Sequence, residues 1–197
     1  MRVLVVGTGL IGTSIGLALT KAGHDVWLED LLPAHVTEAA RMGAGVTGAM
    51  QAEPDVVVVA VPPAAIPAVV RHLSSLYVQS TFTDVASVKT QPVHDIEAIG
   101  DISSRFVGGH PMAGRETSGP TGARADLFED RLWILTPTRR TPPERVAQVR
   151  TLAEDCGAVV TIMDASAHDR AVALTSHAPQ VLASLMAGLI ASASVDD

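Results

Sequence analysis

A histidine and a serine stand in two short segments of this 197-residue sequence and could act together on a hydroxyl group. His110 lies in "RFVGGHPMAGRETSG", where closely spaced glycines and a proline interrupt both helix and strand periodicity, so we expect a loop. Ser87 lies in "DVASVK". A histidine can accept a proton near neutral pH, and a serine hydroxyl can hydrogen-bond a substrate. The plainer interpretations are a helix N-cap for Ser87 and a turn residue for His110.

A glycine pattern near the N-terminus predicts a nucleotide site. Gly7-Thr8-Gly9-Leu10-Ile11-Gly12, called here the glycine fingerprint, follows an apolar strand pattern and opens a helical one. In such a pattern the first glycine makes the tight turn, the second lets backbone approach a pyrophosphate, and the third allows close helix–strand packing. The helix N-terminus then faces the phosphates.

Asp30 stands about twenty residues further on, at the end of the next expected strand. A carboxylate in that place binds the ribose 2′-hydroxyl of NAD, and no arginine stands beside it to hold the 2′-phosphate of NADP. The residue therefore favours NAD over NADP. As the plainer alternative, Asp30 belongs to the N-terminal cap of the helix that starts at Pro33.

The elements that must position these residues alternate between strand and helix patterns. The expected strands are Val3–Val6, Asp25–Glu29, Asp55–Val61, Ser80–Val85, Leu132–Leu135 and Ala158–Met163. The expected helices are Leu10–Ala22, Pro33–Met42, a helix from the Pro62–Pro63 pair to about Leu73, Thr90–Ile99 and Pro143–Cys156. This alternation predicts an α/β fold with a doubly wound, mostly parallel sheet of the Rossmann type.

In such a sheet, ligands bind outside the carboxyl ends of the strands. Val61 and Pro62 follow one expected strand, Ser87 follows the next, and the His110 segment comes after that. We therefore expect Val61 and Pro62 to border the cofactor together with the fingerprint and Asp30. Ser87 and His110 are expected where the nicotinamide ring would lie.

The C-terminal part has a different pattern. From Ala165 onward we expect one long helical stretch, and no charged residue stands between Ala171 and Val195. Its serines, Pro179 and Gln180 make it too polar for a membrane span. We expect it to be buried in a dimer or a helical domain.

Composition excludes several kinds of partner. The net charge is −7 and no basic cluster occurs, so neither nucleic acid nor an anionic membrane surface is expected to bind. A single cysteine, Cys156, cannot form an internal disulfide and suits a reducing cytoplasm. The first residues run directly into a strand pattern, which leaves no room for a secretory signal. No metal site is predicted.

Four segments together resemble the prephenate dehydrogenase family, which includes arogenate-using members. They are "VVGTGLIGTSIGLAL", "DVASVK", "GGHPMAGRETSG" and "HDRAVALTSHAPQ", and the resemblance runs from Met1 to about Leu189. It implies a Rossmann-type NAD-binding domain in residues 1–164. It also implies that residues 165–197 begin a helical dimerisation domain, most of which is lacking, and that the protein is a homodimer. The implied reaction is NAD-dependent oxidative decarboxylation of prephenate to 4-hydroxyphenylpyruvate and CO2, a step of tyrosine biosynthesis.

The resemblance also implies roles for individual residues. His110 matches the histidine that takes the proton of the ring hydroxyl, and Ser87 matches the serine that hydrogen-bonds this hydroxyl. Glu116 matches an acidic residue at the mouth of the substrate site, and His177 matches a histidine near the substrate side-chain carboxylate. The plainer alternatives are a solvated loop residue for Glu116 and a hydrogen-bonded helix residue for His177.

His168 and Asp169 also match the family pattern, and for both we expect a structural role that links the sheet to the following helix. The family's carboxylate-binding arginine has no counterpart, because no arginine follows Arg170. Two other functions remain open beside prephenate or arogenate oxidation. One is another reductase on the same fold, and the other is a non-catalytic NAD-binding module.

Overall fold

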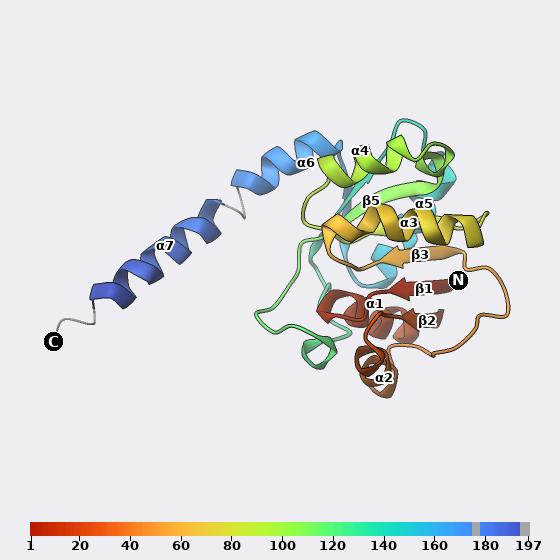
Figure 1. Ribbon diagram of the computed structural model, residues 1–197, viewed down its shortest axis with the longest axis horizontal. Helices are drawn as coiled ribbons and strands as arrows, with labels where there is room; N and C mark the ends of the chain where they lie inside the picture. The colour runs from red at the N-terminus through yellow and green to blue at the C-terminus, as the bar shows by residue number, and fades with distance from the viewer. Residues whose placement is uncertain (175–177, 194–197) are drawn as a thin grey trace.

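Strands and helices alternate along the chain and form one seven-stranded sheet in the order β2-β1-β3-β4-β5-β6-β7 (Figure 1). The computed structural model describes residues 1–174 and 178–193. The strands are β1 (Arg2–Val6), β2 (Asp25–Glu29), β3 (Val56–Val59), β4 (Thr81–Asp84), β5 (Phe106–Pro111), β6 (Leu132–Pro137) and β7 (Val159–Ile162). The α-helices are α1 (Leu10–Lys21), α2 (Pro33–Arg41), α3 (Ile66–Leu76), α4 (Thr90–Ala98), α5 (Pro143–Asp155), α6 (Ala165–Val172) and α7 (Ala178–Ala193).

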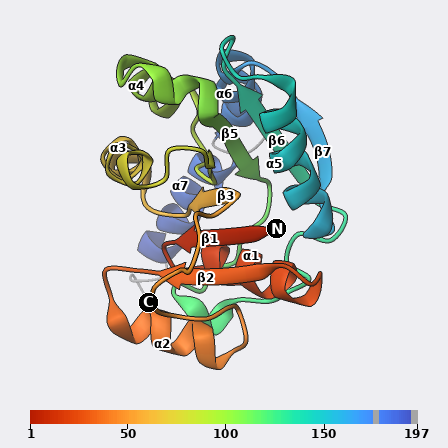
Figure 2. The same cartoon turned by 90° about the vertical axis from the view of Figure 1, so that its right-hand side faces the viewer.

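Helices cover both faces of the sheet because its central strands are apolar on both sides (Figure 2). In β1, Val3 and Val5 pack into a core with α1, α2 and α5, whereas Leu4 packs into a second core with α3 and α4. All four residues of β3 are fully buried. The expected α/β class with a doubly wound, mostly parallel sheet is confirmed, and β5 with β6 is the antiparallel pair.

The strand order identifies the edge of the sheet that matters for ligand binding. β1 pairs with β2 on one side and with β3 on the other, so the chain winds away from β1 in both directions. In sheets of this kind, ligands bind outside the carboxyl ends of the strands at the point where the winding reverses, which here is the end of β1 and β3. The glycine fingerprint and the connections after β3 and β4 leave the sheet at this edge.

The loop predicted over residues 105–119 is wrong for residues 106–111, which form the buried strand β5, whereas residues 112–118 belong to no helix or strand. The glycines of β5 serve close packing and not a turn. A Cβ on Gly108 would lie 2.3 Å from the hydroxyl oxygen of Thr136 in β6, and one on Gly109 would lie 2.6 Å from the carbonyl oxygen of Asp84 in β4. Glycine within a strand often marks such an approach of neighbouring chain.

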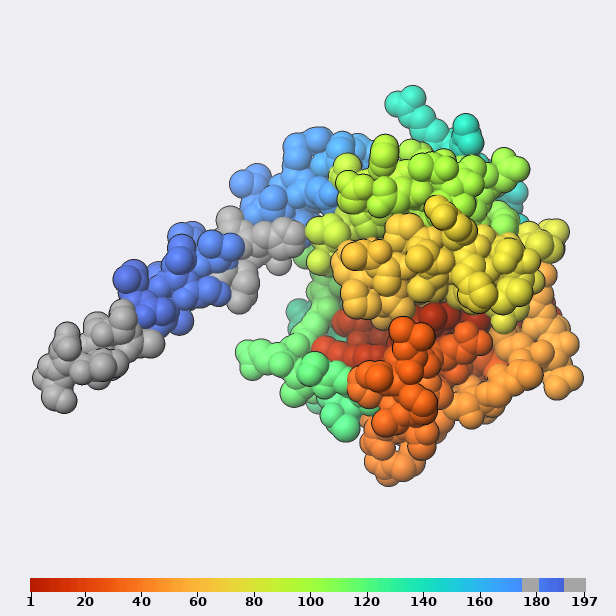
Figure 3. Space-filling model, in the orientation of Figure 1, coloured from red at the N-terminus to blue at the C-terminus, as the bar shows by residue number. Residues whose placement is uncertain are grey.

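The helical stretch expected after Ala165 is helical in the described residues, as α6 and α7, and residues 175–177 between them lie outside the described part of the chain. The Asp164 side chain caps α6 by accepting a hydrogen bond from the Ala167 N–H, and α6 packs against α4 and β6. Figures 1 and 3 show α7 extending away from the sheet. Val181, Leu182, Leu185 and Met186 of α7 are exposed. No helix in residues 1–174 and 178–193 is long and apolar enough to cross a membrane.

Candidate active site

The glycine fingerprint forms a tight turn at the start of α1, with open space beside Gly9. Gly7 has a φ of +99°, and a Cβ there would lie 2.3 Å from the carbonyl oxygen of Ala60. A Cβ on Gly12 would lie 1.9 Å from the carbonyl oxygen of Gly7. Gly9, by contrast, has no atom within 4 Å of its Cβ position. The open space therefore lies at the N-terminus of α1, whose first turn has no acidic residue, and this arrangement fits a bound pyrophosphate.

Asp30 is tied to the fingerprint. Its carboxylate accepts hydrogen bonds from the Thr8 N–H at 2.6 Å, the Thr8 hydroxyl at 2.9 Å and the Leu32 N–H at 2.9 Å. Partial burial opposes ionisation, but these hydrogen bonds lower the pKa of Asp30 below its ordinary value. The residue does not cap α2, because Leu32 is the N-cap and no side chain caps that helix. An ionised carboxylate thus stands beside the glycine fingerprint.

Val61, Pro62 and Ser87 stand on the connections that leave the same edge. A Val61 methyl carbon lies 3.3 Å from the Cβ position of Gly7, so Val61 borders the fingerprint directly. Pro62 is exposed beside it. Ser87 is exposed on the connection between β4 and α4. The N-cap interpretation of Ser87 is wrong, because Lys89 is the N-cap of α4.

His110 lies near the carboxyl end of β5, and 8% of its surface is exposed. β5 runs parallel to β4, with Thr83 opposite Val107, so Ser87, which follows β4, and His110, near the end of β5, lie toward the carboxyl ends of neighbouring strands. Their assignment as catalytic residues stays a prediction. A strand holds His110 more rigidly than the expected loop would, because His110 pairs with Ile134 of β6.

A buried ion pair fixes the backbone next to His110. The Lys89 ammonium group is fully buried and donates to the Asp84 carboxylate and, at 2.6 Å, to the carbonyl oxygen of Gly109. Asp84 also accepts the Gly109 N–H at 3.0 Å. Burial lowers the pKa of Lys89, and the negative charge of Asp84 opposes that shift. Sequence reasoning missed this pair, although an acid at the end of a buried strand with a lysine five positions later was a usable signal.

His168 and Asp169 contact this region from α6. His168 Nε2 lies 2.8 Å from His110 Nδ1, and His168 Nδ1 lies 2.8 Å from an Asp169 oxygen. Asp169 also accepts the N–H groups of Lys89 and Thr90 at 2.8 and 2.9 Å. Asp169 thus ties α6 to the start of α4, and the expected structural link between the sheet and the following helix stays a prediction. The contact between His168 and His110 was not predicted.

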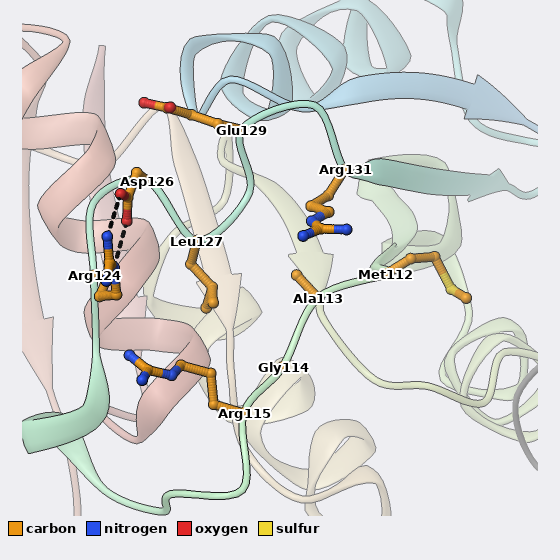
Figure 4. Close-up of a pocket in the computed structure, with 9 residues that line it drawn as sticks. All are labelled: Met112, Ala113, Gly114, Arg115, Arg124, Asp126, Leu127, Glu129 and Arg131. Carbon is orange, nitrogen blue, oxygen red and sulfur yellow. Dashed lines mark hydrogen bonds and ion pairs between the residues drawn. The ribbon is translucent and has the colours of Figure 1, made fainter. Parts of the chain in front are cut away.

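Glu116 is exposed and lines a surface hollow with Gly114 and Arg115. A neighbouring hollow of about 460 Å³ lies between the segment after β5 and the segment before β6 (Figure 4). Arg124 and Asp126 form a two-bond ion pair on its wall, at 2.7 and 2.6 Å. Glu116 is therefore free to meet solvent or a ligand at the surface, and its assignment to the substrate site stays a prediction.

His177 lies outside the described residues. In residues 1–174 and 178–193, no group of three or more His, Cys, Asp and Glu side chains could hold a metal ion. The residues that the structure brings together are those of the fingerprint with Asp30 and Val61, and His110 with His168 and Asp169.

The fold and this edge of the sheet define a dinucleotide-binding domain of the dehydrogenase type. Residues 15–162 match the family model "Prephenate dehydrogenase, nucleotide-binding domain", a span that begins just after the fingerprint. The chain is 40% identical over 190 residues to the "Probable prephenate dehydrogenase NovF" of Streptomyces niveus, with 96% of this chain and 52% of that protein covered.

Two solved structures are similar over nearly the whole chain. Prephenate dehydrogenase of Aquifex aeolicus in complex with hydroxyphenyl propionate and NAD+ superposes with a TM-score of 0.87 at 32% identity, covering 96% of this chain and 68% of that one. Arogenate dehydrogenase of Synechocystis superposes with a TM-score of 0.84 at 30% identity, covering 100% and 70%. This chain belongs to the prephenate dehydrogenase family, and it spans about half the length of its Streptomyces relative. The nucleotide-binding model and the NAD+ complex of the Aquifex relative support NAD as the cofactor.

Proposed function

We propose that this chain carries the NAD-binding and proton-accepting part of a prephenate dehydrogenase. The observation that carries the proposal is the position of His110 near the carboxyl end of β5, at the same sheet edge as the glycine fingerprint, where it pairs with Ile134 of β6. Residues 1–164 would form the NAD-binding domain, and residues 165–197 would begin a helical dimerisation domain. The lone, buried Cys156 suits a cytoplasmic enzyme.

Several residues of this chain would bind the cofactor. The N-terminus of α1 and Gly9 would hold the pyrophosphate, and Asp30 would accept a hydrogen bond from the ribose 2′-hydroxyl. Val61 and Pro62 would contact one side of the cofactor. Bound NAD+ supplies an acceptor for the hydride that leaves ring carbon C4. Glu116 would stand at the mouth of the substrate site, and His177 would lie near the side-chain carboxylate of the substrate.

His110 would accept the proton of the C4 hydroxyl, and Ser87 would hydrogen-bond the same oxygen. As the hydride and the proton leave C4 and its oxygen, the bond from the ring to the carboxylate breaks and CO2 departs. The electron pair of that bond completes the aromatic ring as a phenolate, and the phenolate oxygen takes the proton back from His110 to give 4-hydroxyphenylpyruvate. Aromatisation drives the loss of CO2, so the protein has mainly to align the ring and to supply the base.

The test is the formation of NADH by the purified chain, followed at 340 nm with prephenate and, separately, with arogenate. Reduction of NAD+ with prephenate would support the proposal. Reduction of NAD+ with arogenate alone would show that the substrate is arogenate, the amino analogue of prephenate. NAD binding by calorimetry with no turnover on either substrate would leave a nucleotide-binding module and contradict the proposed reaction.

We also propose that the chain forms a homodimer through α7. Five large apolar side chains of this helix, Val181, Leu182, Leu185, Met186 and Leu189, are 58 to 69% exposed in the single chain. An exposed apolar helix face of this kind favours burial against another surface. Light scattering at micromolar concentration should give twice the chain mass, and a monodisperse monomer would contradict the dimer.

A further inference from the structure

His110 does not stand alone at the end of β5, because a second histidine is bonded to it. His168 of α6 is fully buried, and its Nε2 lies 2.8 Å from Nδ1 of His110. The two rings meet edge to face, with centroids 5.0 Å apart and planes inclined by 68°. One of the two facing nitrogens must therefore carry the proton and the other the lone pair.

The Asp169 carboxylate determines which of the two facing nitrogens carries the proton. The Asp169 carboxylate accepts the N–H groups of Lys89 and Thr90, so its position is fixed by the backbone at the start of α4. Partial burial opposes ionisation, but these bonds and the one from His168 lower the pKa of Asp169 to about 2. An ionised carboxylate only accepts hydrogen bonds.

The proton positions then follow in order along the three side chains. Since Asp169 accepts, His168 Nδ1 donates to it at 2.8 Å. In a neutral imidazole the other nitrogen carries a lone pair, so His168 Nε2 accepts from His110 Nδ1. A neutral His110 with its proton on Nδ1 has its lone pair on Nε2.

We propose that His168 and Asp169 are positioning residues that hold His110 in the tautomer whose Nε2 accepts a proton from the substrate hydroxyl. The assignment of His110 as the base rests on the function proposed above. In the step itself, the O–H bond of the substrate breaks and an Nε2–H bond forms on His110. The positive charge that His110 then carries faces His168 and, through it, the negative charge of Asp169.

Asp84 and Lys89 are the other charged groups beside the His110, His168 and Asp169 side chains, and their opposite charges offset each other. Asp84 comes from β4 and Lys89 from the connection into α4, and they pair with each other around the backbone of Gly109. A charge pair of this kind adds little net potential at His110. Of the charged groups on β4, on the connection into α4 and on α6, Asp169 is thus the one whose charge favours the protonated form of His110.

The wild-type protein gives a direct test by ¹⁵N NMR of its histidine rings. The chain has seven histidines, and the signal of His110 is assigned by its loss in His110→Gln. We expect neutral His110 to carry its proton on Nδ1, whereas imidazole side chains in water prefer Nε2. A neutral His110 with its proton on Nε2 would overturn the proposal without any variant having to fold.

Two variants of one position then separate positioning from packing. His168→Phe keeps an aromatic ring but removes the acceptor, so we expect loss of the Nδ1–H tautomer and of the hydrogen bond that this N–H makes. His168→Gln offers an amide oxygen to the same N–H and should keep that tautomer. His94→Gln is the control, because the His94 side chain is 76% exposed, and it should change neither property.

An unchanged His110 tautomer in folded His168→Phe would overturn the proposal. The NMR result is independent of turnover. Failure of the proposed reaction would appear as absent NADH formation while the Nδ1–H tautomer persists, so the two failures are distinguishable.

Discussion

The two halves of the site are assembled in different ways. In the cofactor half, Thr8 and Asp30 are bonded across 22 positions of the sequence and belong to consecutive β-α-β elements. In the proton-accepting half, His110 meets His168 across 58 positions, and Asp169 meets Lys89 across 80. The first half depends on local turn geometry, whereas the second depends on the docking of α6 onto the sheet. We therefore expect a mutation in one half to impair the function of that half and to leave the function of the other half intact.

The largest effect is expected from His110→Asn, which removes the proposed base but keeps a polar side chain. Turnover with prephenate should fall by roughly 10²–10⁴-fold, the usual contribution of a general base. Wild-type activity should fall at acidic pH as well, because a protonated His110 cannot accept a proton. NAD affinity by calorimetry should stay unchanged, and near-normal turnover of the variant would end the assignment.

Lys89→Met should destabilise the proton-accepting half. The variant leaves the Asp84 carboxylate buried without its partner, which costs about 3–5 kcal/mol of unfolding free energy. Urea denaturation measures the loss. Lys21→Met is the matched control, because Lys21 is 71% exposed and its ion pair is long at 3.9 Å, and it should stay within about 0.5 kcal/mol of wild type. Equal stability of the two variants would contradict the role given to the buried pair.

A pair of alanine substitutions tests the cofactor half. Gly12→Ala places a Cβ against the Gly7 carbonyl oxygen and should cost about 1–3 kcal/mol of stability. Gly9→Ala meets no atom, so the fold should keep its stability while the added methyl group obstructs the pyrophosphate. Thermal unfolding and NAD titration on both proteins separate the two effects. Full NAD affinity in Gly9→Ala would show that the cofactor does not approach this glycine.

Asp30→Ala tests the choice of cofactor. Only NAD presents a 2′-hydroxyl to this carboxylate, so the ratio of NAD to NADP affinity should fall by roughly tenfold. Both affinities should also decline, since Thr8 and Leu32 lose their acceptor. Side-by-side titrations measure the ratio, and a wild-type preference for NADP would contradict this interpretation of Asp30.

The smallest effect concerns Asp169 and pH. Its pKa in the folded protein, about 2, is below the ordinary value of 3.8, so the ionised form stabilises the fold above about pH 4. This contribution, about 1 kcal/mol after screening by solvent, should disappear as the pH falls toward 2. The stability difference between wild type and Asp169→Asn should shrink over that range. A difference that is constant with pH would show that the charge of Asp169 contributes nothing.

The cofactor half could be predicted from the sequence because its signals are local. The Val3–Val6 pattern, the three glycines and Asp30 follow one another at spacings that backbone geometry dictates. The strand at Asp25–Glu29 was predicted with its observed limits, and most other elements were within one to three residues. Alternating strand and helix patterns then left few topologies other than the doubly wound sheet.

The proton-accepting half was decided by tertiary structure. Gly108 and Gly109 have the composition of a turn, and only the neighbouring strands show that their missing side chains make room for Thr136 and Asp84. In the same way, His168 is one histidine among seven in the sequence. Its position against His110 comes from the packing of α6 on α4 and β6, which no local spacing encodes. The amino-acid sequence by itself determined which residues could bind a dinucleotide and accept a proton, and long-range packing decided which partners hold them there.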